Sequence, residues 1–373
     1  MNPQEIFCPH LDCPARGRVG AGNISVHSQK EERYECQVCG TTFAASTGTI
    51  FYRLKKDVQE VLIVLTLLAH GCPVQAIVAA YGFDERTVRS WWQRAGQHCQ
   101  KIHDHTIGHS QLDLQQVQAD EIKVKTQSGT VWMALAMMVS TRLWLGGVIS
   151  RHRDKGLIQA LADQIRRVAL CRPVLLAVDG LPSYVKAFQR TFRSKMPRLG
   201  QPGRCYLRPW SDLAIVQVVK QRAAGSLTIE RRIVQGTADL VERLIQATQG
   251  QGGINTAFIE RLNATFRQRL APLARRTRAL AHQPETLHAG MYVIGCIYNF
   301  CTYHHSLRIP LYLSPTRRRW LRRTPAIAAE ITDHCWTVQE LFQFKVPPPP
   351  WTPPKRRGRP DQETLRLVEQ WSH

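Results

Sequence analysis

Apolar residues recur at helical spacing over residues 57–102, and the pattern predicts three helices. The first follows Asp57 and ends before Gly71. A short second helix covers Val74–Tyr81, and Asp84 is the expected N-cap of a third helix that runs to about Cys99. A glycine between the last two helices is typical of a helix-turn-helix, which we predict for residues 53–110. An ordinary helical bundle is the alternative.

The third of these helices would read DNA if the helix-turn-helix is real. Val88 and Trp92 are expected to pack inward, which leaves the polar positions for the major groove. The predicted DNA-binding residues on this helix are Arg86, Thr87, Arg89, Ser90 and Arg94.

Beyond residue 111 the pattern changes to short apolar runs that are typical of strands. Runs at 112–124, 131–139 and 143–149 predict a three-strand meander, followed by a helix at 154–170. Residues 173–180 predict a buried parallel strand, and a helix follows at 184–192. This order is that of the ribonuclease H-like fold, so we predict an α/β, mixed-sheet domain of that kind over 111–345. A β-hairpin insertion is expected near 200–237, and a late helix at 257–270.

Charge narrows the class of partner. No apolar run approaches the length of about 20 residues that spans a bilayer, and the N-terminus lacks the features of a secretory signal, so we expect no membrane association. The formal net charge is +22, with about +1 on residues 1–110, +10 on 111–260 and +11 on 261–373. Such an excess makes nucleic acid the default partner, held mainly by the later part of the chain.

Four of the eleven cysteines form two short knuckles near the N-terminus. Cys8 and Cys13 are separated by four residues, and Cys36 and Cys39 by two. Four thiolates on paired turns match a tetrahedral zinc site, so residues 1–52 predict a zinc-ribbon-like domain. Four unrelated buried cysteines are the alternative, and His10 is an alternative ligand within the first knuckle.

Three acidic residues are candidates for catalysis. Asp120 lies in the first strand, Asp179 ends the buried strand, and Glu260 lies on the late helix. Carboxylates from neighbouring strand ends and a crossing helix can converge, and their mutual repulsion then calls for divalent cations. Two Mg²⁺ or Mn²⁺ ions would activate the attacking oxygen and stabilise the leaving one.

Each of these acids has an ordinary structural alternative. Asp120 could face solvent while Glu121 is the functional residue, since strand alternation sends the two to opposite faces. Asp179 could be a turn residue, and Glu260 a solvated helix charge. Glu260, however, shares a helix face with Asn263 and Arg267, a combination that suits a metal beside a phosphate backbone, so both are predicted DNA contacts.

Several of these motifs together resemble the DDE class of bacterial insertion-sequence transposases, in which a zinc-binding N-terminus and a helix-turn-helix precede a ribonuclease H-like catalytic domain. The likeness covers roughly residues 8–345. It is carried by the knuckles with CGTTFAASTGTIFYRLK, the ADE strand, VDGLPSY, IERLNATFRQRL, YNFCTYHHSLR and RTPAIAAEIT.

The resemblance implies that Asp120, Asp179 and Glu260 are a metal-binding catalytic triad. It further implies a DNA transposase that cleaves the ends of an element and joins the 3′ ends to target DNA, as a homodimer or larger assembly in the bacterial cytoplasm and nucleoid. The long gap before Glu260 departs from compact members of the class, and Glu230 and Glu242 are its competitors. A catalytically silent DNA-binding regulator and a nuclease without strand transfer are the rival functions.

The last part of the chain, residues 346–373, predicts a Pro-rich basic tail. The run PPPPWTPP favours an extended segment, and KRRGRP follows it. Arg357, Gly358 and Arg359 match the core of an AT-hook, which lies in a narrow A·T minor groove. A solvated basic tail is the alternative.

Overall fold

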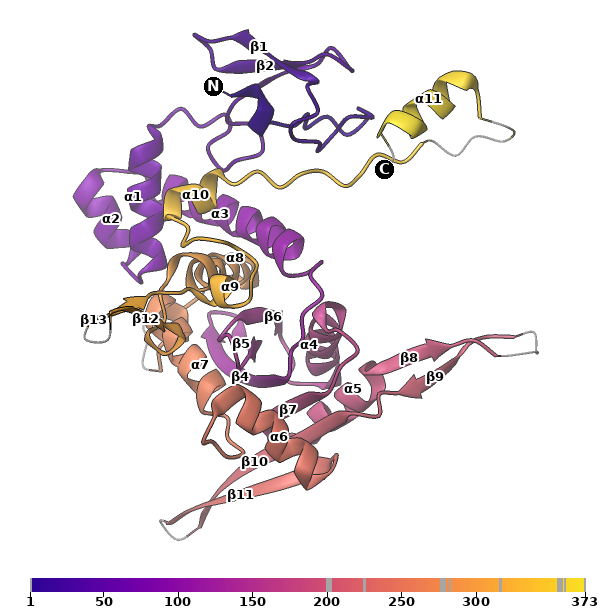
Figure 1. Cartoon of the computed structure of the whole chain (residues 1–373). Helices are drawn as coiled ribbons and strands as arrows, with labels where there is room; N and C mark the ends of the chain where they lie inside the picture. The colour runs from indigo at the N-terminus through magenta and orange to yellow at the C-terminus, as the bar shows by residue number, and fades with distance from the viewer. Residues whose placement is uncertain are drawn as a thin grey trace. The chain divides into compact units, whose positions relative to one another are not determined.

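The computed structural model describes residues 2–198, 203–223, 226–275, 280–281, 283–314, 317–353, 358 and 360–371. The chain divides into two compact units, which are described separately. The first comprises Met1–Val58 with Phe342–His373, and the second comprises Gln59–Leu341. Figure 1 shows the elements of both. No helix in the described ranges has both the length and the apolar character that a membrane span requires.

The first unit is built on a small antiparallel sheet in the order β1-β2-β3. Its strands are β1 (Ile24–Ser28), β2 (Arg33–Cys36) and β3 (Thr42–Ala44). The sheet is too small to bury much apolar surface by itself, so its core combines the aromatic rings of Tyr34 and Phe43 with three buried cysteines.

The C-terminal segment completes that core. Helix α11 (Gln362–Trp371) places Trp371, only 7% exposed, among the buried residues of the small sheet. Arg18 donates a hydrogen bond to the carbonyl oxygen of Trp371 at 2.6 Å, and Arg16 donates to those of Pro349 and Pro350. The predicted tail is therefore attached to the N-terminal part of this unit at Pro349 and Pro350 and at the last turn of α11. Of the predicted AT-hook, Arg357 and Arg359 lie outside the described residues.

The second unit begins with the three expected helices. They are α1 (Val58–Ala69), α2 (Val74–Tyr81) and α3 (Glu85–Thr106). The Asp84 side chain accepts hydrogen bonds from the first-turn amides of α3, as predicted. Helix α3 extends beyond Cys99 because Ile102 and His103 are buried. It packs closely on α8 (Pro284–Cys296), where a side chain at Gly96 would overlap Ala289.

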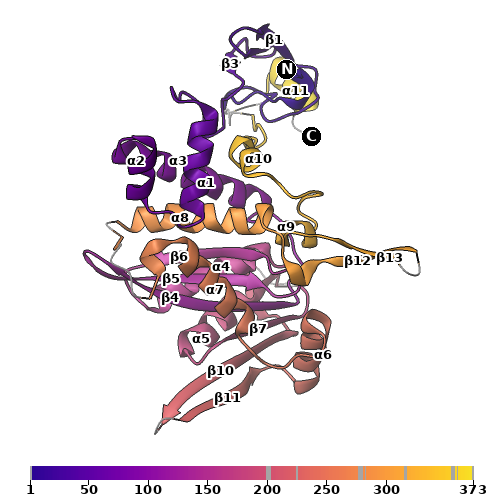
Figure 2. The same ribbon diagram turned by 90° about the vertical axis from the view of Figure 1, so that its left-hand side faces the viewer.

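A six-stranded mixed sheet forms the centre of this unit, in the order β11-β10-β7-β4-β5-β6 (Figure 2). The meander β4-β5-β6 is antiparallel, β7 and β10 run parallel to β4, and β11 is antiparallel to β10. The strands are β4 (Gln116–Thr126), β5 (Gly129–Met138), β6 (Trp144–Ser150), β7 (Val174–Asp179), β10 (Leu213–Ala223) and β11 (Ser226–Gln235).

Helices α4, α6 and α7 pack on this sheet. Helix α4 contacts β5, β6 and α5, whereas α6 packs on β7 and β10, and α7 lies on β4 and β5. The chain leaves α8 through a π-helical turn at Ile297–Cys301 and ends the unit with two short helices. The helices are α4 (Lys155–Val168), α5 (Pro182–Thr191), α6 (Ala238–Gln249), α7 (Ala257–Arg269), α9 (Pro325–Ala328) and α10 (Val338–Gln343).

Two further hairpins form sheets of their own, apart from the main sheet. The hairpins are β8 (Arg193–Met196) with β9 (Tyr206–Pro209), and β12 (Ile309–Ser314) with β13 (Arg317–Leu321). Strand β10 forms the expected hairpin with β11, but it also pairs in parallel with β7 along its first six residues. It belongs to the central sheet because its alternate residues Ala214 and Val216 are buried beneath α6.

We expect Trp371→Ala to destabilise the first unit by about 3 kcal/mol, because it removes a large buried ring from a small core. Hydrogen exchange of the β1–β3 amides in the full-length protein would measure the loss of protection. Leu365→Ala on the same helix is the matched control, since Leu365 is 46% exposed. Equal protection in the two variants would show that Trp371 does not support the sheet.

Candidate metal centres

The four N-terminal cysteines gather at one point in the first unit. Their sulfur atoms lie within 4.8 Å of one another, with Cys8 to Cys39 at 3.7 Å and Cys13 to Cys36 at 3.8 Å. Gly40 adopts a left-handed conformation, φ 65°, and its amide bonds to the carbonyl of Cys36, which forms the second knuckle. The predicted convergence of both knuckles is thus present, and His10 does not belong to the group that the structure brings together.

The cysteine group fits zinc by its dimensions and chemistry. Ligands about 2.3 Å from a tetrahedral Zn²⁺ lie about 3.8 Å apart, close to both sulfur–sulfur distances. Asn23 donates a hydrogen bond to the Cys36 sulfur at 3.5 Å and would orient it. Burial raises the pKa of Cys13 to about 12 and that of Cys8 further, so these thiols hold their protons until a metal displaces them. This buried group could bind Zn²⁺.

The second candidate metal site is a group of acidic side chains at the end of β7 in the second unit. Parallel pairing sets Gln118 opposite Ala177, and two residues further along each strand the same register brings Asp120 level with Asp179. Asp179 is the last residue of its strand, and its Oδ1 atom accepts a hydrogen bond from the amide of Leu181. The predicted meeting of Asp120 and Asp179 is therefore produced by strand pairing.

Glu121 is the third acid of this group. Carboxylate oxygens of Asp120, Glu121 and Asp179 all lie within 4.8 Å of one another. Strand alternation predicts that Asp120 and Glu121 point to opposite faces. Because β7 ends at Asp179, level with Asp120, the longer Glu121 side chain can reach the same group past the end of that strand. The one sequence signal for Glu121 was its position next to Asp120.

Arg153 bridges two of these acids. Its Nη2 atom lies 3.4 Å from the Oε2 atom of Glu121 and 3.2 Å from the Oδ2 atom of Asp179. The guanidinium carbon lies 5.0 Å from the ring centre of Trp132, which supports it from β5. The Glu121 side chain is fully buried, so this cation compensates a charge that water does not reach.

Helix α7 presents the predicted stripe to the same site, but not all of it joins the group. Asn263 donates a hydrogen bond to the Oδ2 atom of Asp120 at 2.8 Å, and Arg267 lies close enough for its charge to act on Asp120. Glu260 instead accepts from Lys220 on β10 at 2.5 Å and from Thr256 at 2.8 Å. Its carboxylate is outside the three-acid group because these two partners hold it.

Both competitors of Glu260 are exposed helix or strand residues away from this group. Glu230 forms an ion pair with Arg232 on β11, and Glu242 accepts a hydrogen bond from Gln246 on α6. Neither shares a contact with Asp120 or Asp179 among those that the structure gives.

Burial dominates the electrostatics of the three-acid group. It raises the pKa of Asp120 to about 6 and that of Glu121 to about 7, and the negative charge of Asp179 raises both further. At Glu260 burial acts in the same direction, but the hydrogen bonds from Lys220 and Thr256 outweigh it and lower the pKa. The site thus concentrates negative charge that a divalent cation would neutralise.

Two orphaned polar atoms support this fit. The Tyr184 hydroxyl is buried without a hydrogen-bond partner among the described residues, and charges of Glu121, Asp120 and Asp179 add to burial in raising its pKa. The Oδ1 atom of Asn263 is likewise buried and unpaired within those ranges. Three carboxylates, a buried hydroxyl and an amide oxygen are hard oxygen groups that suit Mg²⁺ or Mn²⁺ and the waters around them.

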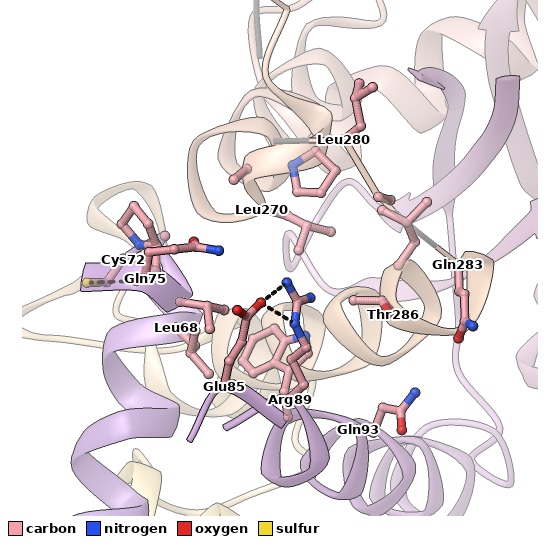
Figure 3. Close-up of a pocket in the computed structure, with 18 of the residues that line it drawn as sticks. Leu68, Cys72, Gln75, Glu85, Arg89, Gln93, Leu270, Leu280, Gln283 and Thr286 are labelled. Carbon is pink, nitrogen blue, oxygen red and sulfur yellow. Dashed lines mark hydrogen bonds and ion pairs between the residues drawn. The ribbon is translucent and has the colours of Figure 1, made fainter. Parts of the chain in front are cut away.

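The predicted reading residues of α3 all lie in the first half of that helix. Arg86, Arg89 and Ser90 line a cavity of about 960 Å³ (Figure 3). Helix α3 forms it with the end of α1, the start of α2 and residues 269–272, 280–281, 283 and 286–287. Arg89 is bound there to Glu85, its Nε atom 2.8 Å from the carboxylate. Thr87 and Arg94 do not line the cavity. Arg86, Thr87, Arg89, Ser90 and Arg94 stay predicted DNA contacts of α3.

Comparison with known proteins identifies no family. Neither a scan against protein-family models nor a search of curated proteins found a match.

We expect about one equivalent of zinc per chain, bound by Cys8, Cys13, Cys36 and Cys39, and its loss in Cys36→Ser, because one tetrahedral ion uses all four thiolates. Metal analysis of purified protein measures this. Cys171→Ser, at an exposed cysteine outside the group, is the control. Purified wild-type protein without zinc would contradict the assignment.

We expect Mn²⁺ to bind the three-acid group about 20-fold more weakly at pH 6 than at pH 8, because protons compete for Asp120 and Glu121 at their raised pKa values of about 6 and about 7. Calorimetric titration of Mn²⁺ into zinc-loaded protein measures the affinity at each pH. Glu121→Gln should weaken binding and flatten the profile, whereas Glu260→Gln should change it little. A profile that is unchanged in Glu121→Gln would remove Glu121 from the site.

Proposed function

We propose that this protein is a DNA transposase that cleaves the ends of a mobile element and joins the 3′ ends to target DNA. The observation that carries the proposal is the meeting of Asp120 and Asp179 at the ends of two parallel strands, with a third carboxylate beside them. A formal charge of +22 and a possible zinc site at the N-terminus agree with a DNA-binding enzyme.

The order of elements supports a ribonuclease H-like assignment for the sheet. The meander β4-β5-β6, helix α4, strand β7 and helix α5 follow the order expected from the sequence, and β10 then adds a parallel strand beside β7. Asp120 lies in the first of these strands and Asp179 ends the fourth. In this assignment β11 and the β8–β9 hairpin are additions to the common core.

The chain's own residues have separate roles in this proposal. Asp120 and Asp179 would hold divalent cations, which when bound supply activation of the attacking oxygen and neutralise charge at the scissile phosphate. Asn263 fixes the orientation of Asp120 through its hydrogen bond, and Arg267 offers positive charge beside it for the DNA backbone. Arg153, held between Glu121 and Asp179, keeps the acids together.

The third acid of the site has two candidates. Glu121 already lies with Asp120 and Asp179, whereas Glu260 is one helix turn from Asn263 and its charge reaches Asp120. We retain Glu260 as the acid that the resemblance implies, bound in this structure to Lys220. Glu121 is the acid that geometry favours.

Asp179→Asn is the test of the proposed function. We expect cleavage of element-end DNA to fall by at least about 1,000-fold while DNA binding stays within about twofold, because the change removes a metal-binding charge and keeps the shape of the side chain. Asp212→Asn, at an exposed aspartate in the loop before β10, is the matched control. Labelled element-end DNA with a target plasmid gives cleavage and joining in one assay.

The products of the wild-type protein separate the rival functions. Joined products support the transposase, cut DNA without joining indicates a nuclease, and binding without cutting indicates a regulator. Cleavage that survives Asp179→Asn unchanged would exclude Asp179 from the chemistry and with it the proposed site.

A further inference from the structure

The β8–β9 hairpin contributes no residue to the proposed catalytic site. The name "β8–β9 arm" is used here for residues 193–198 and 203–209. Its two strands form a sheet of their own, with Arg193 opposite Pro209 and Met196 opposite Tyr206. Figure 1 shows the arm extending away from the central sheet of its unit. A two-stranded hairpin alone is only marginally stable in water, so such an arm needs support at its base or from a partner.

Aromatic residues fix the base of the arm. Phe192 is fully buried, and its ring meets that of Trp210 edge-on at 5.1 Å. The Trp210 indole donates a hydrogen bond to the Ser194 hydroxyl at 2.9 Å, and the guanidinium of Arg166 on α4 lies 4.4 Å from the Trp210 ring centre. The base is thus held on α4 and α5, and the strands beyond it are presented in a fixed direction.

Beyond the base the arm carries positive charge without any acid. Residues 193–209 contain five Lys and Arg residues and no Asp or Glu. Every residue of β9 is exposed, including Tyr206 at 49% and Leu207 at 51%. A group of cations without neighbouring acids creates a positive local potential that attracts a polyanion.

The strand register distributes the cations over both sides of the arm. Lys195 pairs with Leu207 on one face, and Arg208 pairs with Ser194 on the other, next to Tyr206. Each face therefore offers a cation together with an apolar or aromatic side chain. A ribbon with cations on both faces suits a groove that has phosphates along both walls.

We propose that the β8–β9 arm is a β-ribbon that lies in a groove of duplex DNA, where Lys195 and Arg208 contact the phosphate backbone. The major groove, about 12 Å wide, admits a two-stranded ribbon. The inference rests on the proposed function, which supplies DNA as the partner. It assigns to the arm contacts with the DNA backbone that do not depend on base sequence.

The experiment compares salt-dependent DNA binding of the full-length wild type with the variant Lys195→Gln/Arg208→Gln. Fluorescence anisotropy with two duplexes of unrelated sequence, from 0.05 to 0.2 M NaCl, gives the slope of log affinity against log salt. We expect the variant to bind both duplexes about tenfold more weakly at 0.1 M salt, and its slope to fall in size by about 2, one for each lost phosphate contact. Lys101→Gln/Arg243→Gln, at exposed positions of α3 and α6, removes the same charge and should keep the wild-type slope.

Three other outcomes would overturn the proposal. A slope that falls equally in both double variants, or in neither, overturns the role of the arm while the protein still binds DNA. A variant that binds DNA normally but changes the mass of the protein in solution would assign the arm to contacts between copies of the chain and overturn the proposal. Failure of the wild type to bind any duplex would overturn the proposed function as well as this inference.

Discussion

Repulsion among clustered carboxylates is the constraint on which the second unit depends. Carboxylate oxygens of Asp120, Glu121 and Asp179 lie within 4.8 Å of one another at the end of β7, where burial of Asp120 and Glu121 reduces the screening by water. Arg153 forms ion pairs with Glu121 and Asp179, and Asn263 donates a hydrogen bond to Asp120. Lys220 forms an ion pair with the neighbouring Glu260. These partners reduce the repulsion, but burial, reinforced by the charge of Asp179, still raises the pKa of Asp120 to about 6 and that of Glu121 to about 7. A fold whose purpose was stability alone would have little reason to keep such a cluster.

The first unit meets a different constraint, the shortage of apolar surface in a sheet of three short strands. Trp371 covers the small sheet, and a metal held by the four cysteines would cross-link it. The cysteines and Trp371 share one buried core, so a change at either would affect the other. In consequence the C-terminal segment contributes to the N-terminal sheet, and its loss would be felt at the candidate zinc site.

Local patterns in the sequence predicted most of the elements, and pairs of residues far apart in the chain account for what was missed. The Asp84 cap, the meander, the buried strand ending at Asp179 and the cysteine knuckles depend on neighbours within a few residues, so their patterns could be recognised. The parallel partner of β7 could not, because β10 follows a long connection and its apolar run fits a hairpin equally well. The same holds for Trp371, whose partners lie more than 300 residues away.

The site shows the limit of the same reasoning at the level of single side chains. Strand order was enough to predict that Asp120 meets Asp179, but the place of Glu121 depends on where β7 ends, and the place of Glu260 depends on Lys220 reaching across from β10. Neither contact leaves a pattern in the sequence. The most direct test is a crystal structure of the zinc-loaded protein with Mn²⁺, read by anomalous scattering at the manganese edge. The account predicts a manganese peak bounded by the carboxylates of Asp120, Glu121 and Asp179, with the Arg153 guanidinium displaced from them. Full Mn²⁺ binding elsewhere in the chain, with Arg153 still between Glu121 and Asp179, would contradict it.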